Sequence, residues 1–298
     1  MTDVKKLMEK TRSIRILTNR LVDERLSGAY HSMFKGTGVE FDEVRPYIPG
    51  DDVRSIDWNV TARTGAPYIK RYSEERELTV IFAVDVSGSQ IYGSRTRSKA
   101  ELAAEIASLL ALTAIRNQDK IGLILFSDRI VKYLPPRKGR QSVMRLVREV
   151  LAAEDETSGG TDIAGALEFL NNVRKRKAVV FLVSDFFDSG YEERLAVTAR
   201  RHDVVAVKIY DPAERLLPGS GLVELQDPET GELVLADVSN ASVRRAFEEN
   251  AAAEDEALRS LFRRHAIDFI EVSTDGEYVR SICALFARRA ARRNGGRR

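Results

Sequence analysis

Three oxygen-bearing side chains follow an apolar run at alternate positions. Residues 78–84 read LTVIFAV, and Asp85, Ser87 and Ser89 come directly after them. An unbroken apolar run predicts a strand buried on both faces, as at the centre of a parallel sheet. A carboxylate and two hydroxyls suit a hard cation such as Mg²⁺ or Mn²⁺, whereas zinc favours His or Cys. The alternative is that the two serines only cap the helix that follows.

Two later segments add oxygen donors of the same kind. Thr161 lies in the polar loop 158–162, ahead of a predicted helix, and Asp185 follows a second apolar strand at 178–184. Ligands of open α/β sheets collect at the carboxyl ends of strands, where the strand order reverses. The complete set resembles the metal-ion-dependent adhesion site of von Willebrand factor A domains. That resemblance implies one divalent cation, contacted by Ser87, Ser89 and Thr161 and held by Asp85 and Asp185 directly or through water; the alternative is a vestigial site without metal.

A second resemblance covers nearly the whole chain. Its residues are Phe41, Tyr47, Pro49 to Asp52, Arg54, Asp57, Trp58, Ala62, Arg63, Glu74 and Glu75, followed by His202-Asp203, Asp211-Pro212 and the segment 227–231. This pattern resembles bacterial domain-of-unknown-function family fifty-eight, whose members carry a von Willebrand factor A-like domain and are associated with MoxR-type AAA+ ATPases. The resemblance implies a protein-binding module that works with such an ATPase in chaperone-like assembly or remodelling of an unidentified client. An Asp or Glu carboxylate of the partner would complete the coordination of the cation.

The order of apolar and amphipathic segments predicts an α/β fold. From residue 78 onward strands and helices alternate, which indicates parallel βα units. The resemblance to von Willebrand factor A domains then implies a von Willebrand factor A-like (Rossmann-like) doubly wound, mostly parallel six-stranded sheet in the order 3-2-1-4-5-6. Its strands are predicted at 78–85, 120–126, 129–134, 178–184, 204–210 and 267–272, the third being an antiparallel edge strand. Helices are predicted at 99–117, 140–152, 163–175, 191–201, 242–265 and 278–292.

Further parts are expected around this A-like domain of residues 78–292. An amphipathic helix is predicted within 1–33, a small β-rich platform at 34–77, a hairpin insertion at 221–237 and a disordered basic tail at 293–298. The platform holds a dense polar cluster around one aromatic, made of Asp51, Asp52, Arg54, Asp57, Trp58 and Arg63. The cluster is either an interaction surface or a set of turn residues that pair with each other and with backbone donors. In the second case Trp58 would anchor the platform on the A-like domain.

Composition narrows the class of protein. The net charge of 298 residues is only +2, so a nucleic-acid partner is not expected, although the arginine-rich end at 288–298 leaves a salt-dependent tether as an alternative. Cys283 is the single cysteine, which excludes an intrachain disulfide and a Cys-based zinc cluster. No apolar run is long enough for a membrane span and no signal-peptide core is visible, so a cytoplasmic location is predicted.

Enzymatic machinery is not visible in the sequence. P-loop, H-E-x-x-H and G-x-S-x-G patterns are absent, so a non-enzyme is predicted. The alternative is a metal-dependent hydrolase that uses the same cation, with Asp162 or Asp188 as general base. The histidines form no metal-ligand spacing; His202 and His265 each end a predicted helix, where a positive charge is favourable against the helix dipole.

Overall fold

The computed structural model describes residues 30, 39–74, 77–93, 97–153, 159–217, 219–226 and 233–295. The chain forms two compact units, Phe34–Glu77 and the remainder, Met1–Met33 with Leu78–Arg298. The boundaries of the smaller unit coincide with those of the predicted platform. Of the segment 1–33 the structure describes only Tyr30, so the predicted amphipathic helix lies outside the described residues.

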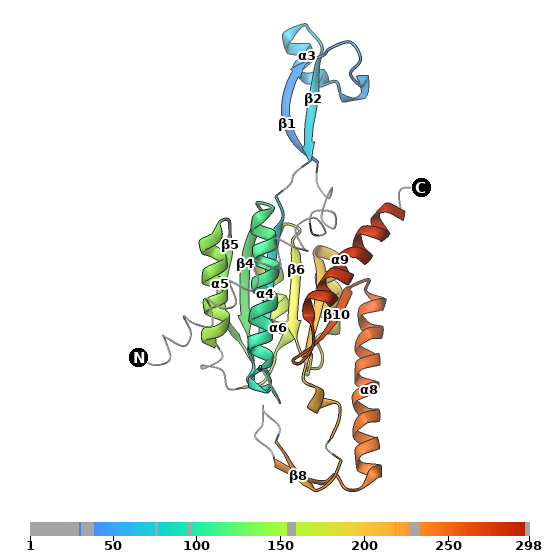
Figure 1. The fold of residues 1–298 in the computed structure, drawn as a ribbon. Helices are drawn as coiled ribbons and strands as arrows, with labels where there is room; N and C mark the ends of the chain where they lie inside the picture. The colour runs from blue at the N-terminus through green and yellow to red at the C-terminus, as the bar shows by residue number, and fades with distance from the viewer. Residues whose placement is uncertain are drawn as a thin grey trace. The chain divides into compact units, whose positions relative to one another are not determined.

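A six-stranded sheet forms the centre of the larger unit (Figure 1). Its strands are β3 (Thr79–Asp85), β4 (Lys120–Phe126), β5 (Ile130–Arg137), β6 (Val179–Ser184), β7 (Asp203–Tyr210) and β10 (Asp268–Ser273). They are arranged in the order β10-β7-β6-β3-β4-β5, with β5 antiparallel to β4 and all other neighbours parallel. This confirms the predicted von Willebrand factor A-like topology. Because β3 and β6 are parallel neighbours, Asp85 and Asp185 lie side by side at the carboxyl ends of these strands.

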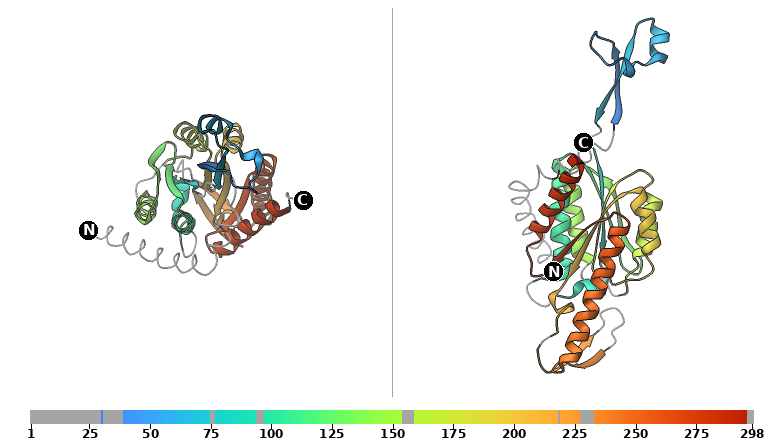
Figure 2. Two further views of the ribbon diagram at one scale, coloured as in Figure 1. Left: turned by 90° about the horizontal axis from the view of Figure 1, so that it is seen from above. Right: turned by 90° about the vertical axis from the view of Figure 1, so that its right-hand side faces the viewer.

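Helices cover both faces of the sheet. They are α4 (Lys99–Arg116), α5 (Arg140–Ala153), α6 (Ile163–Val173), α7 (Glu192–Arg201), α8 (Ala241–Arg264) and α9 (Tyr278–Gly295). In Figures 1 and 2, α4, α5 and α9 lie on one face and α6, α7 and α8 on the other. Within the described residues, none of these helices has the length and apolarity that a membrane crossing requires. The helix α9 continues to Gly295, so the expected tail begins as helix, and 296–298 lie outside the described residues.

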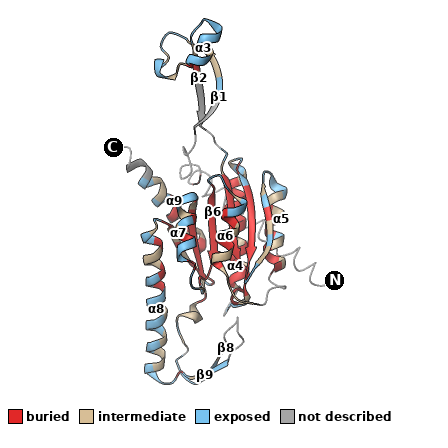
Figure 3. Cartoon of the chain, turned by 180° about the vertical axis from the view of Figure 1, so that it is seen from behind, coloured by how far each residue is buried: buried red, intermediate tan, exposed pale blue. Residues whose placement is uncertain are grey.

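The core lies where apolar strands meet apolar helix faces (Figure 3). Every residue of β3 and of β6 is buried, as the unbroken apolar runs predicted. On one face a single cluster joins Ile81 and Leu182 of the sheet to Leu167 of α6, Leu195 of α7 and Phe262 of α8. Such burial contributes about 25 cal/mol for each Å² of apolar surface removed from water. The strand ends that carry polar side chains are therefore held on a rigid layer.

The predicted insertion is a hairpin between β7 and α8. Strands β8 (Leu222–Gln226) and β9 (Leu233–Asp237) pair antiparallel, and the turn at 227–232 lies outside the described residues. Figure 1 shows the hairpin beyond the carboxyl ends of the parallel strands. Its leucines are largely exposed, for example Leu222 at 69% and Leu235 at 67%.

The smaller unit is built on an antiparallel pair, β1 (Val39–Pro46) and β2 (Tyr68–Glu74). Between them lie a 3-10 turn, Val53–Ser55, and the short helix α3 (Trp58–Thr64), which the sequence analysis did not predict. Asp57 caps α3 by accepting hydrogen bonds from Asn59 N and Val60 N. Gly65 ends it in the left-handed conformation (φ 76°), which glycine adopts at little cost.

Candidate cation site at the carboxyl edge of the sheet

The first loop of the candidate site leaves β3 at Asp85. Asp85 Oδ1 accepts a hydrogen bond from Ser87 N at 2.9 Å, and Ser87 Oγ lies 3.1 Å from Ser89 Oγ. All three side chains are buried. Two neighbouring ligands of an octahedral Mg²⁺ are about 3 Å apart, because each lies about 2.1 Å from the ion. The two hydroxyl oxygens therefore have the spacing of adjacent ligands.

The end of β6 brings Asp185 beside this loop. Ser184 Oγ donates to Asp85 Oδ2 at 2.6 Å and accepts a hydrogen bond from Phe186 N at 2.9 Å. Ser184 is fully buried and orients Asp85 directly, although it was not among the predicted site residues. A hydroxyl in the last position of an apolar strand, directly before Asp185, is the sequence signal that could have identified it. The following residue, Phe186, has a left-handed backbone (φ 63°), a strain that proteins retain mainly at functional sites.

The loop that carries Thr161 approaches the same edge. Gly88 N donates to Gly159 O at 3.2 Å, and Asp162 N donates to Ser127 O at 2.8 Å. These bonds hold the segment 159–162 between the loops that follow β3 and β4. Gly159 has a φ of 138°, which side-chain-bearing residues rarely adopt, so the glycine is required for this path. The structure thus brings the loop that carries Thr161 to Gly88, which stands between Ser87 and Ser89 in the sequence.

The two candidate general bases of the hydrolase alternative hold helix α6. Asp162 Oδ1 accepts from Gly165 N at 2.7 Å, and Asp188 Oδ2 accepts from Ile163 N at 2.8 Å. Both carboxylates thereby satisfy amide groups that the first turn of a helix leaves without partners. Helix capping explains their positions.

Two carboxyl groups, those of Asp85 and Asp185, are buried close together, so it is unfavourable for both to be ionised. Burial, reinforced by the nearby Asp185, raises the pKa of Asp85 to about 7, even though hydrogen bonds from Ser184 and Ser87 oppose the shift. Among the described residues, no group of three or more His, Cys, Asp or Glu side chains is arranged so that it could hold a metal ion. A cation at this edge would depend on hydroxyl ligands as well as carboxylates. The donor set, all oxygen, fits Mg²⁺ or Mn²⁺.

Lys99 lies in the candidate site, although the sequence analysis did not predict it there. Its ammonium group is fully buried and donates to Asp185 Oδ2 at 2.7 Å and to Glu214 Oε1 at 2.5 Å. Burial acts to lower the pKa of Lys99, but the two carboxylates outweigh it, so the pKa is raised and the side chain is charged. Lys99 is the first residue of α4, after the N-cap Ser98. A positive charge in the first turn is unfavourable with the helix dipole. This unusual position was the signal in the sequence that could have identified Lys99.

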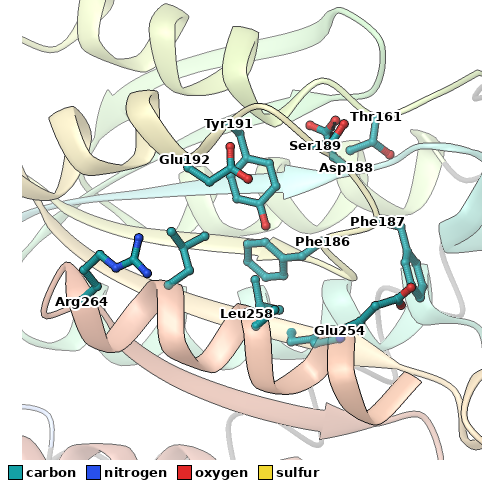
Figure 4. Close-up of a pocket in the computed structure, with 13 residues that line it drawn as sticks. Thr161, Phe186, Phe187, Asp188, Ser189, Tyr191, Glu192, Glu254, Leu258 and Arg264 are labelled. Atoms are coloured by element: carbon teal, nitrogen blue, oxygen red, sulfur yellow. Dashed lines mark hydrogen bonds between the residues drawn. The ribbon is translucent and has the colours of Figure 1, made fainter. Parts of the chain in front are cut away.

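A pocket of about 760 Å³ adjoins Thr161 (Figure 4). Its walls come from the loop after β6, including Phe186 and Tyr191, and from Leu258 and Leu261 of α8. Figure 4 shows Asp188 and Ser189 beside Thr161 at one end and Arg264 at the other. The candidate site therefore adjoins a hollow that is lined by both apolar and charged side chains.

Three carboxylates of the polar cluster in the smaller unit have local partners. Asp51 accepts two hydrogen bonds from the Arg45 guanidinium, at 2.7 and 2.8 Å, and a third from Ile48 N. Asp52 caps the 3-10 turn at Arg54 N. Asp57 caps α3 and lies 3.5 Å from the Lys70 ammonium. Trp58 is 70% exposed, and Arg54 and Arg63 are also exposed.

Several known proteins are similar to this chain. An uncharacterized protein of Mycobacterium tuberculosis strain H37Rv is 29% identical over 290 residues, which cover 96% of this chain and 91% of that protein. An uncharacterized protein of Mycobacterium avium is 28% identical over 151 residues, or 50% of this chain and 89% of that protein.

Among solved structures, BatB from Bacteroides thetaiotaomicron covers 72% of this chain and 99% of its own, with 17% identity and a TM-score of 0.48. The VWA domain of SpRpn10 covers 70% of this chain and 94% of its own, with 12% identity and a TM-score of 0.35. The profile of one protein family matches residues 43–257, well over half of the sequence. The chain belongs to the family described as "Protein of unknown function DUF58".

Proposed function

We propose that this protein is a non-catalytic protein-binding module that engages a partner through one Mg²⁺ or Mn²⁺ ion. Ser87, Ser89 and Thr161 would contact the ion, with Asp85 and Asp185 holding it directly or through water. The observation that carries the proposal is the pair of buried hydroxyls, 3.1 Å apart, beside two carboxylates at one sheet edge. When bound, the ion would offer an open position to a carboxylate of the partner.

The charges around the edge support a divalent ion. Asp85, Asp185 and Glu214 are three carboxyl groups, and Lys99 is one ammonium, so the four groups carry a net charge of −2 when all are ionised. Uncompensated charge in a buried site is costly, and it is relieved either by protonation or by a bound cation. A single divalent ion would balance these four groups.

The proposed partners follow from the family resemblance. We place the module in the cytoplasm beside a MoxR-type AAA+ ATPase, where it would present an unidentified client for assembly or remodelling. The pocket supports an interaction role, because Thr161, one of the proposed ligands, is among the residues that line it. Its lining combines apolar side chains with charged ones, and binding sites are usually concave with a few polar groups that orient the ligand.

Calorimetry with Mn²⁺ tests the cation site. Wild-type protein should take up one equivalent, and Asp85→Asn should lose that uptake, because an amide cannot supply the negative charge. Glu277→Ala is the control, since its side chain is 85% exposed and its loss should leave uptake unchanged. Identical uptake by Asp85→Asn and wild type would exclude Asp85 from the site.

Partner binding is tested with the same variant. Pull-down of the ATPase or its client should be strong in Mg²⁺ and weak in EDTA for wild type, and weak in both buffers for Asp85→Asn. The thermal midpoint in EDTA should fall only modestly, because the amide keeps the volume of the buried carboxyl and removes its charge, although it has one acceptor oxygen where Ser87 N and Ser184 Oγ now use two. Equally tight complexes in EDTA and in Mg²⁺ would move the interface away from this edge.

A further inference from the structure

A positive charge already lies inside the candidate cation site. The Lys99 side chain has no exposed surface, and neither does Asp185, whose Oδ2 it contacts at 2.7 Å. The other carboxylate oxygen, Asp185 Oδ1, accepts from Phe187 N at 3.2 Å. Both oxygens of this candidate ligand therefore already have protein donors. A buried ammonium paired in this way is held by strong, charge-assisted hydrogen bonds.

We propose that Lys99 is a built-in competitor of the divalent cation for Asp185, and that Glu214 holds its ammonium when the cation binds. This inference rests on the proposed function, because it concerns the same cation site. Lys99 thereby sets how tightly the site binds a metal ion. It also connects the site to the chain segment that leads into the β8–β9 hairpin.

The competition follows from charge and distance. Two cations that share one buried carboxylate repel each other, and their repulsion is stronger in the protein interior than in water. If Asp185 contacts the ion, its bond to Lys99 weakens, and the ammonium needs another acceptor. Such an acceptor is present, because Glu214 Oε1 lies 2.5 Å from Lys99 Nζ.

Glu214 is well placed to keep the displaced ammonium. It ends a short 3-10 turn, Pro212–Glu214, directly after β7, and its Oε2 accepts from Asp211 N at 2.8 Å. That bond fixes the carboxylate within reach of the Lys99 ammonium. The ring of Phe187 lies 5.6 Å from the ammonium and adds a weaker attraction. Glu214 therefore favours cation binding in two ways, by its own negative charge and by drawing Lys99 away.

Two substitutions are predicted to change metal affinity in opposite directions. Lys99→Gln removes the competing charge and should tighten Mn²⁺ binding at least about tenfold. Glu214→Gln removes a negative charge and leaves the ammonium wholly to Asp185, so binding should weaken by about tenfold. Calorimetric titration of the full chain with Mn²⁺ gives both values. If Lys99 had only a structural role, the Lys99→Gln substitution would not increase the affinity for Mn²⁺.

Lys208 provides a matched control. It is also buried, and its ammonium donates to Asp255 Oδ1 at 2.6 Å, which is not a candidate ligand. It lies 5.7 Å from the same Phe187 ring. Lys208→Gln removes an equivalent buried charge but leaves Asp185 paired, so Mn²⁺ affinity should stay within about threefold of wild type. A tenfold gain in this variant would show that any loss of buried charge suffices, and would overturn the specific role of Lys99.

The outcomes separate this inference from the proposed function. If wild type binds Mn²⁺ and Lys99→Gln binds it no more tightly, the competition is wrong while the cation site stands. If only Lys99→Gln binds Mn²⁺, the competition is supported and the cation-dependent function of the wild type fails. If neither binds Mn²⁺, both fail. Should Lys99→Gln not fold, Glu214→Gln decides the question, because unchanged or tighter binding there overturns the proposal.

Discussion

Burial determines the charge of His202. Its position at the end of a helix suggests a positive charge, but its surroundings favour the neutral ring. His202 is the C-cap of α7, where an imidazolium would stabilise the helix end. Instead the ring is only 2% exposed, and within the described residues neither nitrogen has a hydrogen-bond partner. Burial, assisted by the nearby Arg201 and Arg174, lowers the pKa of His202 to about 4 from an ordinary 6.5. The expectation of a positive charge at this helix end is therefore wrong.

We predict that His202 makes the fold sensitive to acid. Its folded-state pKa is lowered, so the unfolded chain binds the proton more readily between pH 6.5 and about 4. The stability contributed by neutral His202 is fully present above pH 6.5 and is lost as the pH falls toward 4, by about 1 to 3 kcal/mol. Denaturant unfolding across this range should show a smaller loss for His202→Gln than for wild type. An equal loss would assign the acid sensitivity to other groups.

At the scale of elements, the first turn of α4 positions the candidate site. Ser98 and Glu101 form a capping box, with Glu101 N donating to Ser98 Oγ at 3.1 Å and Ser98 N donating to Glu101 Oε2 at 3.2 Å. In addition, Arg97 donates to Thr274 O at 2.6 Å and Gly276 O at 2.7 Å, which ties this turn to the loop after β10. These bonds fix the start of α4 and so the base of the Lys99 side chain.

The capping box should have a measurable effect on stability. Ser98→Ala leaves an amide of the first turn without its acceptor and should cost about 1 kcal/mol of the free energy of unfolding. Ser142→Ala is the control, because Ser142 is half-buried in the first turn of α5 and its Oγ donates to Lys138 O instead of accepting from a helix amide. Chemical denaturation compares the two variants. Equal stability of both would mean that packing alone fixes the start of α4.

At the scale of the whole molecule, the two compact units differ greatly in their cores. The larger unit buries whole strands, whereas in Phe34–Glu77 only Asp57 and Ile69 are buried among the residues whose exposure the structure describes. An isolated two-stranded antiparallel pair is at best marginally stable in water. The local bonds of Asp51 and Asp57 shape the smaller unit but remove little apolar surface from water.

We therefore predict that a peptide of residues 34–77 does not fold alone. Its circular dichroism should be that of a largely unfolded chain, and its amide NMR signals should be poorly dispersed. The same amides within the full chain should be dispersed and protected from exchange. A peptide that unfolded cooperatively on heating would contradict this expectation and show that the unit supplies its own core.

Much of the fold could be predicted because its signals are local. Unbroken apolar runs identified β3 and β6, and alternation with amphipathic segments gave the parallel βα order and the edge strand β5. The helix α3 was missed, because seven residues carry too little periodicity to be distinguished from a turn. Its start depends on one side chain, Asp57, whose capping role only the folded backbone reveals.

The sequence by itself determined which oxygen donors end β3 and β6, because apolar patterning dictates which strands are buried. That these two strands are neighbours was implied by the resemblance to von Willebrand factor A domains. Only the tertiary structure decided what surrounds those donors. Lys99 meets Asp185 across 86 positions and Glu214 across 115 positions. Contacts of this kind leave no periodic signal in the sequence. A lysine in the first turn of a helix is normally solvated, and only the packing of α4 against the sheet excludes water from Lys99.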